Sequence, residues 1–421
     1  MKVKGHEISL YMFFAALFAL SFEQALVRYL GLDTSFKPYR LALLLSFVMT
    51  CFSGWKLDRR SFLFVATFFG IYSWGIVLGL ITSAVGAGDM SLTLHQAQLF
   101  FLGFLFCLVP LATIDHTTRL TQIWIVILIS AVVSSVIALV DTNSYVYRFS
   151  GFFRNPNHYG YLVALSILVS LSVLQDLKSV SIKFLLIGWI ALGGILLILC
   201  GSRGAFVAVL LASALLFYRK RNERSRDRKS RSSLQVFSAI TLATGSTAAV
   251  INAGFIDLAI LTRFEIEAVT GAAGRTDIWR AGLLAAADSN YLGIGIGQYI
   301  GVHSNYILQV GATLSDTVFK YDLGLHSEIV SIFVEFGVVV LLLYVVLLFV
   351  LWRALVAQRK ICPELNRVSI LCEAMLVLTF VFSLTQDVYT FPYYWLVIGM
   401  CISTCRMRKP SATEGLRLYP R

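Results

Sequence analysis

The sequence is a succession of long apolar segments, broken once by an extended polar stretch at about residues 253 to 326. Each segment approaches or reaches the roughly 17–25 residues that a helix needs to cross a bilayer. We therefore predict an all-α polytopic membrane protein with nine transmembrane helices in 1–252, a large outer loop with short helices in 253–326, and three more transmembrane helices and a tail in 327–421. The predicted helices lie near 8–27, 39–55, 61–83, 96–113, 121–140, 158–174, 182–200, 203–218, 234–252, 327–352, 368–386 and 390–405.

The composition of the chain is that of a membrane protein. Of its 421 residues, 58% are hydrophobic and only 14% are charged, whereas a soluble protein carries about 25% charged residues. The apolar runs are unbroken rather than alternating, which argues against a transmembrane β-barrel. The first run follows Lys2 and Lys4 and leads into Glu23, Gln24 and Arg28 instead of a small-residue cleavage site, so we expect a retained first span.

Lysine and arginine residues predict the topology. With the N-terminus in the cytoplasm, most of the 35 basic residues fall in cytoplasmic loops and in a cytoplasmic C-terminal tail, as the positive-inside rule requires. The stretch 253–326 then lies outside. The densest basic run, 219–231, is interpreted as a topology anchor, with binding to anionic lipid or a cytoplasmic partner as the alternative. Because topology explains the net charge of +12, we expect membrane lipids but no nucleic acid as partners.

The sequence has no pattern typical of a metal site. Its seven cysteines lie outside 253–326 and lack the paired spacing of a zinc site or a disulfide framework. Cys401 and Cys405, four residues apart, are interpreted as small residues on one helix face. No DxD-type acidic cluster occurs in the long outer stretch. We therefore expect no metal and no cofactor.

Two arginines on the expected outer side are candidates for binding an anion, because the guanidinium fork matches phosphate oxygens. Arg203 lies in GSRG (201–204), where a span meets the outer surface; the alternative is an ordinary interfacial arginine in a tight turn. Arg275 begins a predicted helix that runs to about Asp288 and whose N-terminus would favour phosphate. The alternative is a helix that packs on the outer face, with Arg275 paired to Asp277.

The predicted helix after Arg275 has an expected cap and an expected buried face. Thr276 or Asp277 can cap its first turn. Arg280, in the same helix, is a possible supporting residue for the anion. The apolar face of the helix is predicted to consist of Ile278, Trp279, Leu283 and Ala286.

A histidine and a glutamate are the candidate acid–base groups. His326 opens HSEIVSIFVEFG (326–337), and a histidine at the outer interface can act as a general base because its unperturbed pKa is about 6.5. The alternative is a polar interfacial residue, and His303 in the same stretch competes with it. Glu335, expected inside the span that follows, is a possible supporting residue or a helix–helix hydrogen-bonding group.

Two further segments carry weaker signals. Arg148 begins RFSGFFRNPNHYG, in which NPN (155–157) predicts a turn and a helix start. Arg148 and Asn157 are possible supporting residues. The GxGxG pattern at 293–297 has no strand–turn–helix unit around it, so we interpret it as a flexible turn rather than a nucleotide site.

Four of these segments occur in an order that resembles the O-antigen ligase and O-antigen polymerase superfamily of bacterial polysaccharide assembly. The resemblance covers roughly residues 145 to 345. The family often has Asn after the histidine, where this chain has Ser327. The matching segments are RFSGFFRNPN (148–157), GSRGAF (201–206), GRTDIWRAGL (274–283) with YLGIGIGQY (291–299), and HSEIVSIFVEFG (326–337).

The resemblance implies an inverting, metal-independent glycosyltransferase on the outer face of the bacterial inner membrane. Its donor would be a glycan on undecaprenyl diphosphate. Its acceptor would be a lipid A core in a ligase, or another lipid-linked repeat unit in a polymerase of O-antigen or exopolysaccharide. Arg203 and Arg275 match the family's diphosphate-binding arginines, and His326 matches the histidine that activates the acceptor hydroxyl.

A transporter or flippase for lipid-linked oligosaccharides is the alternative function. It would draw charges from several spans into a central cavity and would carry repeated halves. Most predicted spans have no charge at their centres, and the halves show no repeat. The pattern therefore favours the glycosyltransferase, and it predicts that Arg203, Arg275 and His326 lie together near the outer surface.

Overall fold

The computed structural model describes residues 2–23, 25, 37–53, 55, 57–140, 149–174, 177–224, 275–310 and 324–407. Within these ranges the predicted all-α fold is confirmed, because every regular element is a helix and no strand occurs. Seven of the helices are long and apolar enough to cross a membrane, and α1 and α3 are shorter apolar helices. The helices are α1 Lys2–Leu20, α3 Pro38–Phe52, α4 Arg59–Ala84, α5 Met90–Thr113, α6 Thr117–Val140, α7 Pro156–Leu174, α8 Val180–Leu199, α9 Arg203–Arg224, α12 Arg275–Asp288, α13 Gln298–Gln309, α15 Glu328–Ser331, α16 Val338–Ile361, α17 Asn366–Ser383 and α18 Pro392–Arg406.

The predicted apolar segments correspond closely to these helices. A helix covers most of each of them except the ninth, 234–252, which lies outside the described residues, and the first, 8–27, has its helix α1 end at Leu20. The tenth differs, because the long apolar helix α16 begins at Val338 and not at residue 327. The residues before it form α15, a π-helical turn at Ile332–Phe336, and Gly337 with φ of 94°. Of the predicted outer loop, the described part contains α12 and α13.

Capping residues and prolines set where several helices begin. The Asp58 carboxylate accepts hydrogen bonds from the backbone N–H groups of Arg60 and Ser61 at the start of α4. Asp89 accepts from Ser91 in the same way at the start of α5. These side chains satisfy backbone donors that have no partner within the helix. Proline opens α3, α7 and α18, where its missing N–H costs nothing.

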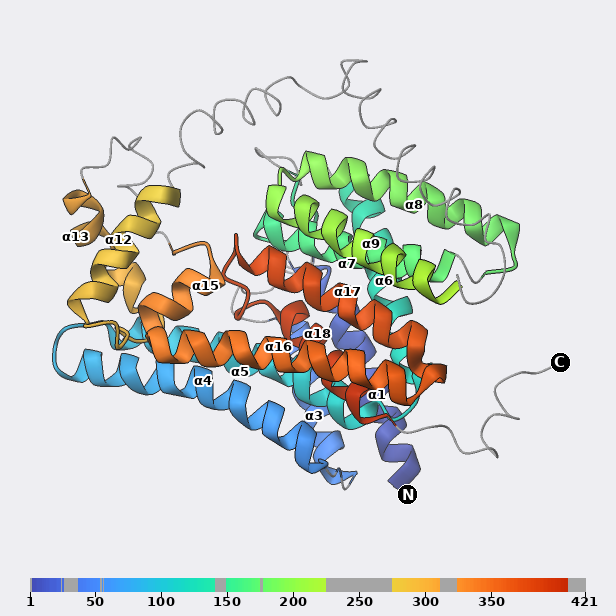
Figure 1. Cartoon of the computed structure of the whole chain (residues 1–421), viewed down its shortest axis with the longest axis horizontal. Helices are drawn as coiled ribbons and strands as arrows, with labels where there is room; N and C mark the ends of the chain where they lie inside the picture. Colours follow the sequence, from blue (N-terminus) through green and yellow to red (C-terminus); the bar gives the residue numbers. More distant parts are fainter. Residues whose placement is uncertain are drawn as a thin grey trace, which may run out of the picture.

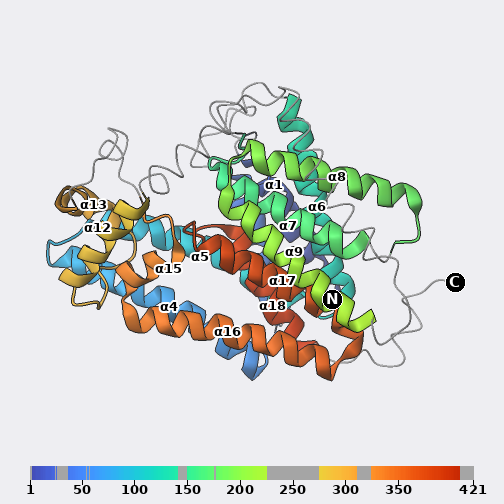
Figure 2. The same ribbon diagram turned by 45° about the horizontal axis from the view of Figure 1, so that its top comes forward.

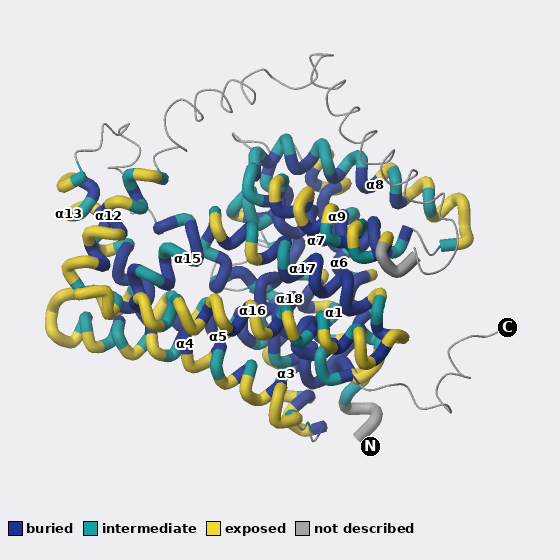
Figure 3. The backbone as a smooth tube through the Cα atoms, viewed as in Figure 1, coloured by how far each residue is buried: buried dark blue, intermediate teal, exposed yellow. Residues whose placement is uncertain are grey.

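The helices form one bundle (Figure 1). The long helices α4 and α16 lie side by side, and α12 and α13 lie at one end of them in both views (Figures 1 and 2). Helix α18 packs against α5, α16 and α17 and is almost entirely buried (Figure 3). Helices α7, α8 and α9 pack together on the opposite flank, where α9 contacts α17. Helices α17 and α18 therefore lie between the two flanks, because α17 contacts α9 and α18 contacts α5 and α16.

Different polar contacts occur at the two ends of the bundle. At the end opposite α12 and α13, the Arg406 guanidinium donates to the Ile114 carbonyl, and Arg60 lies beside it in a shared pocket. The start of α1 lies at this end too, since His6 contacts Ser53. At the other end, Gln298 of α13 hydrogen-bonds to the α4–α5 connection.

The glycine pattern at 293–297 forms a tightly packed turn, which corrects its interpretation as a flexible one. All three glycines have positive φ, which favours residues without a Cβ. The Gly295 N–H donates to the Glu335 carbonyl at 2.8 Å, and the Ile296 N–H donates to the Gly75 carbonyl at 2.9 Å. A Cβ at position 295 would overlap the backbone of Gly79. The turn therefore joins α4 to the segment that follows His326.

Replacing Gly295 with alanine should destabilise the protein strongly. The φ of 98° disfavours any side chain by about 1–3 kcal/mol, and the overlap with the Gly79 backbone adds to this cost. Thermal unfolding of the detergent-solubilised protein measures the effect. Gly188→Ala on α8 is the control, because a Cβ there meets open space. Equal unfolding temperatures for the two variants would contradict the packing described for this turn.

Candidate functional site

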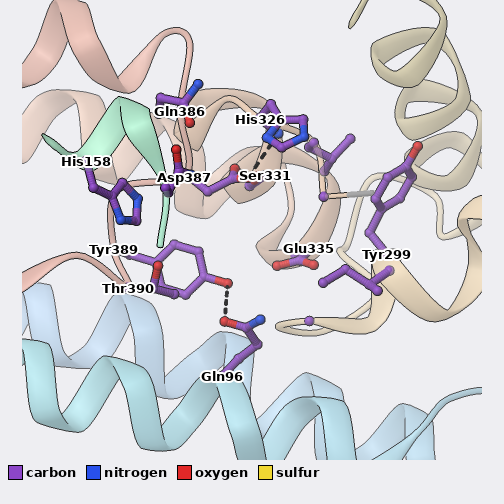
Figure 4. A pocket seen from close by; sticks show the side chains of 15 residues that line it. Gln96, His158, Tyr299, His326, Ser331, Glu335, Gln386, Asp387, Tyr389 and Thr390 are labelled. Carbon is purple, nitrogen blue, oxygen red and sulfur yellow. Dashed lines mark hydrogen bonds between the residues drawn. The ribbon is translucent and has the colours of Figure 1, made fainter. Parts of the chain in front are cut away.

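A polar cavity of about 230 Å³ lies at the end of the bundle near α12 and α13 (Figure 4). Its walls come from α5, the start of α7, the start of α13, residues 324–335 and the loop between α17 and α18. Of the residues predicted for the site, His326 and Glu335 line it. The cavity is lined by Gln96, Asn155, His158, Gly297, Tyr299, Ile300, Gly324, Leu325, His326, Ser331, Glu335, Gln386, Asp387, Tyr389 and Thr390.

His326 is held in an unusual backbone conformation by an aspartate from a distant part of the chain. Its φ is 52°, in the left-handed region that few non-glycine residues occupy. The His326 N–H donates to Asp387 Oδ2 at 2.9 Å, and the Ser331 hydroxyl donates to Asp387 Oδ1. Ser327 caps α15 directly after it. Strained backbone of this kind persists where surrounding contacts maintain it and is frequent at functional sites.

Glu328 connects the loop that carries Asp387 to α15. Its carboxylate is completely buried and accepts hydrogen bonds from the N–H groups of Val388 and Tyr389 and from the Tyr72 hydroxyl. Its own N–H donates to the Gln386 carbonyl at 3.1 Å. Removing a buried carboxylate with three donors would leave those donors unpaired. Glu328 therefore holds the loop in the position from which Asp387 reaches His326.

The surroundings of His326 favour its neutral form. Burial lowers the pKa of His326 below its ordinary value of 6.5, and the nearby Arg275 guanidinium lowers it further. The Asp387 carboxylate acts in the opposite direction and raises this pKa. The net shift is downward, so at neutral pH the imidazole has a free lone pair that can accept a proton.

Glu335 lies in the cavity wall and not inside a transmembrane helix, which corrects its predicted position. It belongs to the π-helical turn before α16 and is only 5% exposed. Burial raises the pKa of its carboxyl to about 8, and the Asp387 charge adds to this, while N–H groups of Gly297 and Tyr299 oppose it. The side chain points toward the cavity from the wall near Tyr299 (Figure 4).

Arg275 begins the helix that packs on the residues around His326. The Trp279 indole N–H donates to the Leu325 carbonyl at 2.9 Å, one residue before His326. Gly282 lets the helix approach Leu325 and Val334 closely. Arg275 is near enough to His326 to affect its pKa, although it does not line the described cavity. The structure thus brings two of the three predicted key residues together.

Details of this helix differ from the prediction. Thr276 and Asp277 lie within α12, which the structure describes from Arg275 onward, and their predicted role as a cap stays a prediction. Leu283, predicted to be on the buried face, is 49% exposed. The buried face consists instead of Ile278, Ala281, Gly282, Ala285 and Ala286.

Two neighbouring candidates point away from the cavity. Arg280 has a side chain that is 70% exposed and pairs with Asp277 at 3.8 Å, so the predicted support from Arg280 has no contact with the site. His303 is buried, and its Nδ1 lies 3.0 Å from the Tyr299 hydroxyl. It does not line the cavity. The geometry therefore favours His326 in the competition between the two histidines.

Arg203 begins α9 beside the loop that carries Asp387. A Cβ on Gly204 would overlap the Thr385 hydroxyl, two residues before Asp387. Arg203 is half-buried and does not line the described cavity. The start of α9 is thus at the same end of the bundle as His326, on the side of the α17–α18 loop.

The remaining predicted positions contribute less. Arg148 lies outside the described residues. Asn157 is the second residue of α7, and its N–H donates to Asn155 Oδ1 at 2.8 Å. Its neighbours Asn155 and His158 line the cavity instead. In the described part of the chain, no three His, Cys, Asp or Glu side chains gather as a metal site would require.

Comparison with known proteins gives a family match to one part of the chain. The family model of the O-antigen ligases matches residues 186–345, which include Arg203, Arg275, His326 and Glu335. A comparison with curated proteins found no match. Residues 186–345 are therefore similar to an O-antigen ligase domain, which supports the resemblance to the O-antigen ligase and polymerase superfamily, in a chain whose described residues include seven helices long and apolar enough to cross a membrane.

Proposed function

We propose that the protein is an inverting, metal-independent glycosyltransferase of the bacterial inner membrane. It transfers a glycan from undecaprenyl diphosphate to an acceptor at the periplasmic face. The acceptor is either another lipid-linked repeat unit, in a polymerase of O-antigen or exopolysaccharide, or a lipid A core, in an O-antigen ligase. Both termini are cytoplasmic in this proposal, and α12 and α13 belong to the periplasmic loop. The family match to residues 186–345 supports an enzyme of this general type.

The observation that carries the proposal is the position of His326. Its imidazole lines a small polar cavity, its backbone is held by Asp387, and Arg275 lies near enough to affect its pKa. A histidine acts as a general base only when its imidazole is neutral and accessible to the proton that it removes. His326 meets both conditions.

The reaction follows from these positions. The imidazole of His326 removes the proton from an acceptor hydroxyl, and the hydroxyl oxygen attacks the anomeric carbon of the donor sugar. The bond from that carbon to the phosphate oxygen breaks, and its electron pair leaves with undecaprenyl diphosphate. Attack opposite the leaving group inverts the anomeric carbon. The proton on His326 passes to solvent or to the departing diphosphate.

In this proposal, arginines supply the positive charge that a metal ion supplies in other transferases. The leaving diphosphate gains negative charge as the bond breaks, and stabilising that charge lowers the barrier. Arg275 and Arg203 each begin a helix, so the guanidinium charge adds to the partial positive charge of the helix N-terminus. We assign the diphosphate to this pair.

The environment of His326 predicts how transfer depends on pH. His326 acts as a base only when neutral, so transfer should fall as the pH drops through its pKa. Because that pKa is lowered, the acid limb of the kcat/KM profile should lie below pH 6.5. Asp387→Asn keeps an acceptor for the His326 N–H but removes the charge that raises the pKa, so the acid limb should move to still lower pH. A shift to higher pH would contradict this role of Asp387.

The fate of glycan in a deletion strain tests the proposed function. Surface glycan reduced to a single repeat would identify a polymerase. Long polymer retained on undecaprenyl diphosphate, together with a bare lipid A core, would identify a ligase. Unchanged surface glycan and carrier lipid would contradict both, and single repeats held on the cytoplasmic side would indicate a flippase instead.

A further inference from the structure

The wall of the cavity that faces His326 is built from neutral hydrogen-bonding groups. The Tyr389 hydroxyl donates to Gln96 Oε1 at 3.1 Å, and the Gln96 amide nitrogen points away from Tyr389 (Figure 4). Because an amide has two donors on nitrogen and Gln96 lines the cavity, its nitrogen can donate to a ligand there. Asn155 and Gln386 add further amides. Amides pair with hydroxyl groups as both donors and acceptors.

Flat rings complete this wall. The His158 ring stacks on Phe391 with centroids 4.2 Å apart and planes 19° apart. The ring of Tyr389, which is 5% exposed, packs against Tyr72. A rigid ring that presents an apolar face and a polar edge suits a ligand with both characters. A sugar ring, with C–H groups on its faces and hydroxyls at its edge, is such a ligand.

The charge and the size of the cavity restrict which sugar it can hold. Among the described residues that line it, none is Lys or Arg, whereas Glu335 and Asp387 are both carboxylic acids. The carboxylate of a uronic acid would meet two acidic groups and no lysine or arginine among these described lining residues, which is costly. The volume of about 230 Å³ is below the roughly 300–1,000 Å³ of sites for drug-sized ligands, so it suits one sugar ring.

We propose that this cavity is the acceptor subsite and that it selects an uncharged terminal sugar. The assignment to the acceptor rests on the proposed function. The reacting hydroxyl contacts His326, and the amides of Gln96, Asn155 and Gln386 hold the neighbouring hydroxyls. The diphosphate lies outside the cavity, toward Arg275 and Arg203.

Saturation-transfer NMR on the full chain in nanodiscs tests this selection. The probes are the methyl glycosides of glucose, galactose, N-acetylglucosamine and N-acetylgalactosamine, compared with methyl glucuronide and methyl galacturonide. At least one neutral glycoside should bind, and its uronide counterpart should bind at least about tenfold more weakly. Equal or tighter binding of the uronides would overturn the proposal, as would the absence of binding by every neutral probe.

A positive charge introduced into the cavity wall tests whether the sugar binds in this cavity. Gln96→Arg should reduce the preference for the neutral glycoside by about tenfold, since an arginine can pair with a uronate. Gln98→Arg is the matched control, because Gln98 lies on the same helix with an exposed side chain and should leave the preference unchanged. An unchanged preference in Gln96→Arg, or equal shifts in both variants, would overturn the location.

Binding of glycosides and transfer of glycan are separate readouts. If neutral glycosides bind as expected but the wild-type protein transfers no glycan, the proposed function fails while the sugar site remains. If transfer occurs but the acceptor carries a terminal uronic acid, the selectivity fails while the proposed function remains.

Discussion

Replacing His326 with alanine should lower glycan transfer by about 10²–10⁴-fold, the contribution expected of a general base. The protein should still insert and fold, because the described contacts of His326 are made through its backbone N–H. His326→Asn is the companion variant, since Asn tolerates the left-handed backbone that His326 adopts. Glycan profiles of a complemented deletion strain and transfer by the purified protein both measure the loss.

His303→Gln is the control for this loss. His303 lies in the same outer stretch but is buried beside Tyr299, away from the cavity lining. A glutamine can keep a hydrogen bond to the Tyr299 hydroxyl, so this variant should retain transfer. Normal glycan from both His326 variants, or an equal loss in His303→Gln, would remove His326 from the mechanism.

Replacing Arg275 with alanine should lower transfer by about 10²–10³-fold, the loss expected when one charge-stabilising donor is removed. Arg275→Lys should recover only part of it, because an ammonium cannot make the paired hydrogen bonds of a guanidinium to phosphate. The same reasoning applies to Arg203→Lys. Initial rates with a lipid-linked donor measure each variant, since a diphosphate contact that strengthens in the transition state acts on kcat.

Arg280→Ala is the matched control on the same helix. Its side chain is 70% exposed and its partner is Asp277, and an exposed ion pair contributes only about 0–1 kcal/mol. Because this contribution is so small, the rate of transfer should remain within a few-fold of the wild-type rate. Equal losses in Arg275→Ala and Arg280→Ala would indicate that α12 matters only for stability and would withdraw the role of Arg275.

The helices could be predicted from the sequence because apolar runs of this length have few other structures. The start of α16 could not. Six of the ten residues from 327 to 336 are apolar and run directly into the apolar helix that follows, and a hydrophobic pattern does not distinguish a buried turn from a span. The break comes from Gly337, whose φ of 94° separates the π-helical turn from α16.

The buried face of α12 is a second feature that could not be predicted from the sequence. Large apolar residues suggest burial, yet Leu283 is exposed and the adjacent Gly282 packs on Leu325 and Val334. Close approach of two segments requires small residues, so glycine and alanine take the inner face. That choice depends on the neighbour, which local sequence does not identify.

Only part of the candidate site could be predicted, because local sequence does not identify contacts between distant parts of the chain. His326, Arg275 and Glu335 stand out locally as polar residues at helix starts or within apolar runs. Asp387 and Glu328 were not predicted, because their roles depend on contacts about 60 residues apart along the chain. The available signal was an acidic residue at the outer end of a predicted span, in the sequence TQD (385–387), where charges are rare and often functional.

The most direct test of the account is product analysis with the purified protein in nanodiscs and an undecaprenyl-diphosphate-linked glycan as donor. The account predicts that wild-type protein releases undecaprenyl diphosphate in step with the appearance of a longer glycan or a glycosylated lipid A core, and that His326→Asn does neither. Movement of the intact donor across the bilayer, without release of undecaprenyl diphosphate, would contradict the account and identify a transporter.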